Sequence, residues 1–341
     1  MSAKRWATAK RKITNFYRDC REMQGEGPAY FVFSVLLMVF ASPFLLLEVL
    51  VYLSAGRDIG WFPESADRTQ PDVRVATTAD VIAMMEPLKR PAMHLVGTSA
   101  SVRSRLGGAP DLPEGFQWPH WKNAPLAFLA QIDLAEIGQQ SALPDLPDEG
   151  LLHFFYDQEQ STWGFHPDDR GSWQVFYSRD SAELRRTDPP AAVAREGRFD
   201  EQRVEFREVM TCPSLERLSE QALQVSDETW DEIDTLRGRD FKDMPRHQLG
   251  GLPNPVQGDA MELECQLASH GIDVGGPAGY ASPEAQALES GAADWVLLLQ
   301  LDTDDDTGMM WGDVGTLYFW IREADLKAHE FSNCWMVLQC G

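Results

Sequence analysis

Short apolar runs separated by glycine- and proline-rich turns recur through most of the chain after residue 105. Runs of four to eight apolar and aromatic residues between such turns predict buried β-strands. A polar and apolar mixture over residues 78–86, with Thr77 or Thr78 before it and Pro87 after it, predicts a short helix. The predicted strands cover residues 125–134, 150–157, 172–177, 295–302, 315–320 and 335–338.

The strand pattern occurs twice in the chain. In each copy a Gln-x-Asp step ends one buried run, a glycine begins the next run, and a tryptophan opens the last one. A repeat of this length predicts an internal duplication. The matched positions are Gln131 and Gln300, Gly150 and Gly315, and Trp173 and Trp335, which lie 169, 165 and 162 residues apart.

This repeat predicts the fold class. We expect an α+β, β-rich and internally duplicated domain, with two similar, mainly antiparallel sheets packed in one core and peripheral helices. The halves cover about residues 105–180 and 248–341. The charged residues 181–246, with helix-like runs near 213–224 and 227–236, are expected to be an insert that joins the halves. Residues 78–341 then form one globular domain.

The N-terminal region has a different pattern. Residues 29–53 are almost entirely apolar, which is long enough for a single transmembrane helix. A secretory signal peptide is the alternative, although its apolar region is usually shorter. The excess of Lys and Arg in residues 1–28 predicts a cytoplasmic N-terminus and a globular domain outside the cytosol. Residues 54–77 are expected to be the linker, so the protein would meet the membrane through residues 29–53.

Charge limits the possible partners. The formal net charge of −23 disfavours nucleic acid, whose phosphates it would repel, and favours another protein as the partner. The five cysteines form no CxxC pair, so a zinc site is not expected. Residues 261–265, which alternate apolar and acidic side chains, predict the solvated face of an edge strand rather than an acid/base cluster.

The acidic loop after the strand 295–302 is the candidate metal site. Its alternating carboxylates would suit a hard cation such as Ca²⁺, although the loop lacks the glycine and the glutamate of a helix-flanked calcium loop. A solvated hairpin loop is the simpler interpretation, so no cofactor is expected, with Ca²⁺ or another divalent cation as the alternative. The candidate ligands are Asp302, Asp304, Asp306 and Asp313.

Tryptophans in predicted loops are the candidate partner-binding residues. Most tryptophans of the chain are expected in the core, because indole rings bury a large area. Those in loops would bind a peptide, sugar or protein if they were exposed together. They are Trp118, Trp121, Trp163 and Trp311.

Several unusual motifs carry a family resemblance. Gly107-Gly-Ala-Pro-Asp-Leu-Pro113, residues 125–134, residues 247–265 and residues 309–321 resemble the bacterial YwqG-like family, a domain of unknown function. The resemblance covers about residues 81–341. It implies a compact α+β fold with large sheets and an association with secreted toxin and immunity systems, but no catalytic residue. Members are usually soluble, so a cytoplasmic globular domain is the alternative location.

Two functions follow from these observations. The first is a membrane-tethered, non-enzymatic module for protein interaction or ligand binding, because the chain shows no nucleophile elbow, phosphate loop or dinucleotide fingerprint. The alternative is a metal-dependent enzyme or metal-binding domain that uses the loop from Asp302 to Asp313.

Overall fold

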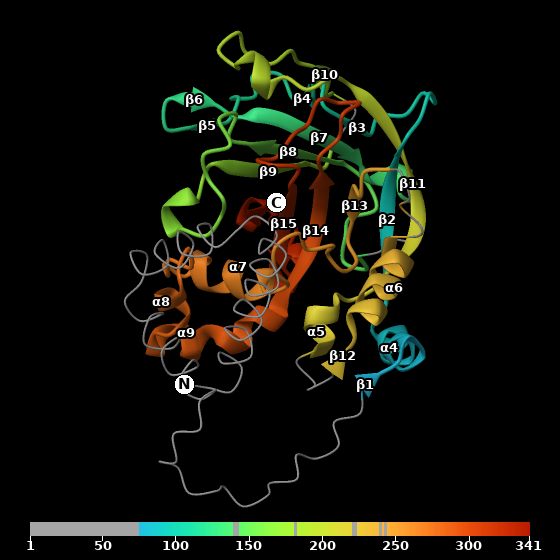
Figure 1. The fold of residues 1–341 in the computed structure, drawn as a ribbon. Helices are drawn as coiled ribbons and strands as arrows, with labels where there is room; N and C mark the ends of the chain where they lie inside the picture. Colours follow the sequence, from blue (N-terminus) through green and yellow to red (C-terminus); the bar gives the residue numbers. More distant parts are fainter. Residues whose placement is uncertain (1–74, 139–142, 181–182, 220–223, 239–240, 242–243) are drawn as a thin grey trace, which may run out of the picture. The chain divides into compact units, whose positions relative to one another are not determined.

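The computed structural model describes residues 75–138, 143–180, 183–219, 224–238, 241 and 244–341, all within the compact unit Val73–Gly341. Its main element is a ten-stranded, nearly closed sheet in which every strand pairs antiparallel with its neighbours (Figure 1). Its spatial order is β16 (Trp335–Gln339), β15 (Thr316–Arg322), β14 (Trp295–Asp302), β13 (Gln248–Leu249), β2 (Arg90–Gly97), β11 (Gln202–Thr211), β3 (Arg105–Leu106), β7 (Ala127–Asp133), β8 (Leu151–Tyr156) and β9 (Trp173–Ser178).

Three small strand pairs and the helices lie around this sheet. The pairs are β1 (Val75–Ala76) with β12 (Gln224–Val225), β4 (Asp111–Leu112) with β10 (Arg185–Arg186), and β5 (His120–Trp121) with β6 (Ala124–Pro125). The helices are α4 (Thr78–Met85), α5 (Leu215–Ser219), α6 (Asp227–Gly238), α7 (Met261–Ser269), α8 (Pro277–Tyr280), α9 (Pro283–Leu288) and α10 (Glu323–Lys327). The predicted helix near residue 78 is confirmed, and the Thr77 side chain caps it by accepting from the Asp80 amide.

The expectation of two separate sheets is wrong. Strands β2 and β11 pair along eight residues, from Val204 opposite Gly97 to Thr211 opposite Arg90, and join the two halves into one sheet. Strand β11 comes from the stretch expected to be an insert. Its charged positions conceal this strand in the sequence, because the buried Val204 and Val209 lie on opposite faces and are separated by mostly charged residues.

The expected transmembrane helix is not supported. Residues 29–53 lie outside the described residues, and no helix within residues 75–341, apart from the gaps given above, is long and apolar enough to cross a membrane. The expected orientation, with the globular domain outside the cytosol or alternatively in the cytoplasm, stays a prediction.

The two halves share their local geometry. Residues Gly107 and Gly250 both take a left-handed conformation, with φ of 60° and 70°, after the short strands β3 and β13. Their amides donate to the carbonyls of Leu129 and Leu298, 2.8 and 3.1 Å away. At these carbonyls β7 and β14 each carry a register irregularity. The halves therefore correspond position by position in this part of the sheet.

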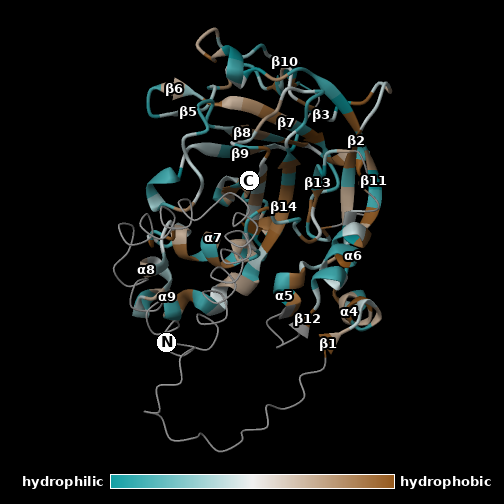
Figure 2. Cartoon of the chain, in the orientation of Figure 1, coloured by the Kyte–Doolittle hydropathy of each residue, from teal (hydrophilic) through white to brown (hydrophobic). Residues whose placement is uncertain are grey.

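One apolar core serves both halves. Phe154 of β8 packs edge to face against Phe319 of β15, with ring centroids 5.2 Å apart. Trp173 and Trp335, on the two edge strands, pack the same way at 4.9 Å. Figure 2 shows hydrophobic colour along β7 and β14. Because burial of aromatic area is a large stabilising term, these contacts hold the sheet in its nearly closed form.

A short segment between β8 and β9 seals the edge of β16. The Trp163 carbonyl accepts from the Leu338 amide at 3.1 Å, and the Gly164 carbonyl accepts from Trp335 Nε1 at 2.8 Å. Pairing of this kind satisfies backbone groups that an open edge strand would leave exposed. Gly164 lies so close to β16 that it has no room for a side chain.

Candidate functional site

The acidic loop begins with an aspartate that serves the fold. Asp302 ends β14, where its Oδ2 accepts from the Arg246 amide at 3.0 Å and its Oδ1 accepts from Thr316 Oγ1 at 2.9 Å. The corresponding Asp133 of the first half accepts from the Ala135 amide at 3.1 Å. Both carboxylates thus bond to neighbouring turns and strands, as aspartates at strand ends often do.

Asp304 is buried and forms a pair with His247. The Asp302 amide donates to His247 Nδ1 at 3.1 Å, so the ring proton of the neutral imidazole lies on Nε2, which is 3.4 Å from Asp304 Oδ2. Burial acts to raise the pKa of Asp304. Hydrogen bonds from His247, the Asp306 amide and Thr307 outweigh burial and hold that pKa below its usual value.

The four candidate metal ligands have no common focus. Asp302 and Asp304 direct their carboxylates at protein donors, whereas Asp306 and Asp313 are exposed. Within the described part of the chain, no three His, Cys, Asp or Glu residues form a group that would hold a metal ion. A bound calcium ion needs six to eight oxygen ligands, and these four carboxylates do not converge to provide them.

The four candidate tryptophans do not form one surface. Trp311 is only 1% exposed, and its Nε1 donates to the Asp302 carbonyl at 3.1 Å. Trp118 donates to the Leu126 carbonyl at 2.9 Å and packs on Phe155, and Trp121 is half-buried in the same small apolar cluster. Only Trp163 is exposed, at 36%. Both Trp118 and Trp311 thus seal the fold.

Two loops beside the end of β16 carry exposed apolar side chains. Val314 is 63% exposed and Met310 is 43% exposed, and both flank the buried Trp311. The Gln160 side chain ties this loop to the loop of Trp163, because its Nε2 donates to the Met310 carbonyl at 2.9 Å and its Oε1 accepts from the Gly312 amide at 3.2 Å. We call Gln160, Trp163, Met310 and Val314 the double-loop surface.

Two residues of the double-loop surface have a strained backbone conformation. Of the described residues other than glycine, four have a positive φ, and two of these are Gln160 at 52° and Val314 at 51°. A β-branched residue in this left-handed conformation destabilises the folded state. Asn or Gly at the same position would destabilise it much less. Strained residues of this kind cluster at sites that bind or switch.

Trp311, one of the four tryptophans expected to bind a partner, does not lie at the surface. Its size drew attention, yet the ring fills the core between Tyr156 and Phe199. The sequence feature that could have indicated a strained turn is Val314 directly before Gly315, where the chain turns back into β15.

Comparison with known families gives one match. The model of a family described as a domain of unknown function (DUF1963) matches residues 104–340, which is more than half of the chain. No curated protein matches the chain.

Proposed function

We propose that this chain, which belongs to the DUF1963 family, is a non-enzymatic module that binds a partner protein through the double-loop surface. The observation that supports this proposal is the coincidence of strain and exposure. Two residues held in a left-handed conformation lie where three apolar side chains face solvent. Protein interfaces are built around such apolar anchors, which a partner removes from water.

The charges around the double-loop surface define the partner's chemistry. Asp305, Asp306 and Asp313 are exposed in the same loop as Met310 and Val314. Carboxylates around an apolar centre favour a partner with basic residues around an apolar patch. The net charge of −23 would add long-range attraction for such a partner.

We also propose that the chain is a YwqG-like member of this family. The motifs at residues 107–113, 125–134, 247–265 and 309–321 support this finer assignment. The association with secreted toxin and immunity systems, which the resemblance implies, would make the partner a protein of such a system.

Replacing Met310 and Val314 by aspartate is expected to abolish partner capture. The double variant puts two charges where the partner would bury apolar area, and one such loss lowers affinity by tenfold or more. The measurement is an affinity purification of the full chain from the cells that produce it, with the bound proteins identified by mass spectrometry. The control is Val256→Asp, an exposed valine in another loop. Equal capture by all three proteins would contradict the proposal.

Replacing Val314 by glycine tests whether the strained valine lowers the free energy of unfolding. We expect Val314→Gly to raise the free energy of unfolding by about 1 kcal/mol, because glycine adopts a positive φ without the steric penalty of a β-branched side chain. Urea denaturation measures the change. Partner capture should weaken in the same variant, since the exposed apolar side chain is lost. A stabilised variant with undiminished capture would show that Val314 is not a contact residue.

A further inference from the structure

A row of polar side chains crosses the first half of the sheet. Arg203 on β11 lies opposite Arg105 on β3, Arg105 lies opposite Gln131 on β7, and Gln131 lies opposite His153 on β8. Residues that face each other across antiparallel strands lie on one face and contact their neighbours. These four side chains therefore form one continuous strip.

The second half has a corresponding row of different composition. His94 lies opposite Gln248, Gln248 opposite Gln300, and Gln300 opposite Tyr318. Gln248 takes the place of Arg105, and Tyr318 takes the place of His153. The glutamines are the same in both rows, because each bonds to the loop that follows its glycine turn.

Gln248, Gln300 and Tyr318 of the second row bond to backbone groups, whereas His94 lies 3.2 Å from the Arg207 guanidinium. Gln300 accepts from the Asn254 amide at 2.9 Å and donates to the Arg246 carbonyl at 2.8 Å. Tyr318 donates to the Asn254 carbonyl at 2.6 Å, and Gln248 donates to the Gly250 carbonyl at 3.0 Å. The fold thus needs only uncharged side chains at these positions.

The first row contains buried groups that lack partners. Gln131 bonds to the Asp111 amide at 2.7 Å, as Gln300 does to Asn254. Arg105, only 5% exposed, places Nη2 2.6 Å from Asp111 Oδ2, but its buried Nε has no hydrogen-bond partner among the described residues. Both ring nitrogens of the completely buried His153 lack a well-formed hydrogen bond, although the Asp111 backbone lies close enough to raise the pKa of the imidazole.

The protonation states in this row are defined by burial. Burial lowers the pKa of His153 to about 4, and the nearby Arg105 and Arg103 act in the same direction against Asp111. His153 is therefore neutral near pH 7 and offers one N–H donor and one acceptor nitrogen. Burial also lowers the pKa of Arg105, while Asp111 supports its charged form.

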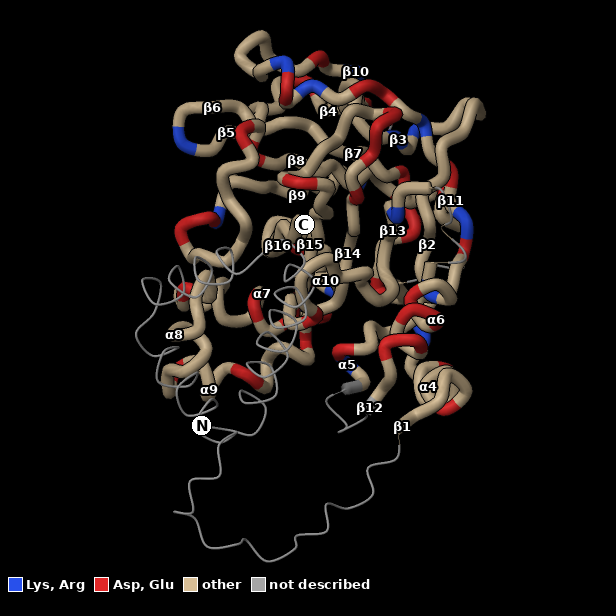
Figure 3. Tube along the Cα trace, in the orientation of Figure 1, with Lys and Arg blue, Asp and Glu red and all other residues tan. Residues whose placement is uncertain are grey.

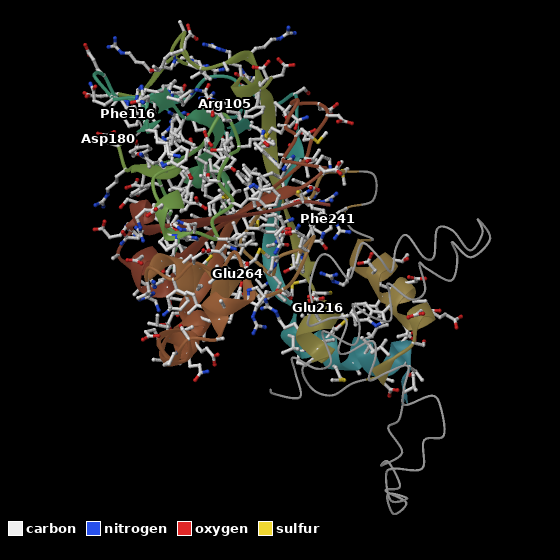
Figure 4. All side chains as sticks on the ribbon, turned by 60° about the vertical axis from the view of Figure 1, so that its left-hand side comes forward. Arg105, Phe116, Asp180, Glu216, Phe241 and Glu264 are labelled. Carbon is white, nitrogen blue, oxygen red and sulfur yellow. The ribbon has the colours of Figure 1, made fainter. Side chains whose placement is uncertain are left out.

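Guanidinium groups surround the strip at the surface. The side chains of Arg103, Arg186 and Arg203 are between 37% and 45% exposed. Their carboxylate partners lie deeper, with Asp111, Asp133 and Glu201 between 10% and 28% exposed. Figure 3 shows the basic segments at β3 and near β10, and Figure 4 labels Arg105 among the side chains of this half. These arginine side chains are therefore more exposed to solvent than the carboxylates that they contact.

We propose that this polar row, with Arg105 and His153 at its centre, binds a small oxoanion, either a phosphate or a carboxylate. An oxoanion oxygen accepts from the Arg105 Nε–H and from the His153 N–H, and Arg103, Arg186 and Arg203 supply the remaining charge. The second row, in which Gln248 and Tyr318 take the places of Arg105 and His153, has the same backbone arrangement without these two groups. This site is separate from the double-loop surface and does not depend on it.

The test is calorimetric titration of the full chain with inorganic phosphate at low and constant ionic strength. We expect saturable heat and a melting temperature that rises with phosphate concentration. Acetate and sulfate titrations in parallel distinguish a carboxylate site from a site for tetrahedral anions. A wild-type chain that gives no saturable heat with any of the three anions would overturn the proposal.

Two variants give the first half the residues of the second. Arg105→Gln and His153→Tyr should each fold and bind the anion at least tenfold more weakly. The control is Arg179→Gln, which removes the same charge from a highly exposed side chain of this half. If either buried variant fails to fold, the exposed Arg203→Gln variant replaces it and should weaken binding about threefold. Affinity that is the same in the control and in all folded variants would refute the site.

Discussion

Gly164→Ala is expected to destabilise the domain by roughly 3 kcal/mol or more. A Cβ at residue 164 would lie 1.8 Å from the Met336 carbonyl oxygen, and the φ of 81° disfavours any L-side chain. The contact is with the backbone of β16, which cannot move without breaking the Trp163 to Leu338 hydrogen bond. The free energy of unfolding from urea denaturation, monitored by tryptophan fluorescence, measures the effect.

Gly115→Ala is the matched control for this substitution. Gly115 has nearly the same φ, 78°, but nothing lies within 4 Å of the position that its Cβ would take. The control therefore isolates the conformational cost, about 1–2 kcal/mol, from the cost of displacing β16. Equal losses in the two variants would show that the segment at Gly164 does not hold the edge of the sheet.

Most of the strands that the sequence predicts well are buried on both sides, whereas β9 is buried only at Trp173 and Val175. β7, β8, β9, β14, β15 and β16 all lie within or almost within the predicted apolar runs, because a buried strand needs a continuous apolar stretch. β2 and β11 were missed, since β11 alternates apolar residues with charged ones such as Glu205 and Arg207. These two strands decide whether the halves form one sheet or two. Because the prediction did not include them, the predicted architecture was wrong.

The candidate sites show the same division between local and tertiary information. The role of Asp133 in bonding its own turn was predictable, because it depends on residues two positions away. The burial of Trp311 was not, since its contacts Tyr156 and Phe199 come from distant strands and loops. The polar row could not be predicted from the sequence either, because Arg105 and His153 come into one row only through the register of β3, β7 and β8.

Residues 261–265 show how a short alternating pattern is misread. Their apolar and acidic alternation predicted an edge strand, but they begin helix α7. The longer period decides, since Met261, Cys265 and Ala268 are spaced three and four apart and are all buried. As a result Glu262 and Glu264 do not share a solvated strand face. Glu264, labelled in Figure 4, instead contacts Tyr280 of α8 and is influenced by the charge of Asp259, which pairs with Arg217.

The carboxyl group of Glu264 is expected to make stability depend on pH near neutrality. Burial raises its pKa from 4.5 to about 7, and the charges of Glu262 and Asp259 add to this shift. Its Oε1 accepts from Tyr280 at 3.5 Å, while its Oε2 has no partner among the described residues. The Arg217 side chain bonds to Asp259 and to Glu262.

The sign of the effect follows from proton binding. Between pH 4.5 and about 7 the folded chain keeps the Glu264 proton while the unfolded chain has lost it, so the folded state binds more protons. The free energy of unfolding therefore falls as pH rises through this window. The shift from 4.5 to about 7 corresponds to at most roughly 3 kcal/mol, lost in full above pH 7.

Glu264→Gln should remove this dependence, because the amide stays neutral at every pH. We expect the variant and the wild type to have similar stability near pH 4.5, and the variant to be more stable by up to roughly 3 kcal/mol at pH 8. Urea denaturation at half-unit pH intervals measures the difference. Glu284→Gln, an exposed glutamate of α9, is the control for the change in net charge. If the difference between Glu264→Gln and the wild type does not change from pH 4.5 to 8, Glu264 is ionised in the folded protein throughout that range, and the carboxylate must find a cationic or hydrogen-bonding partner in this cluster.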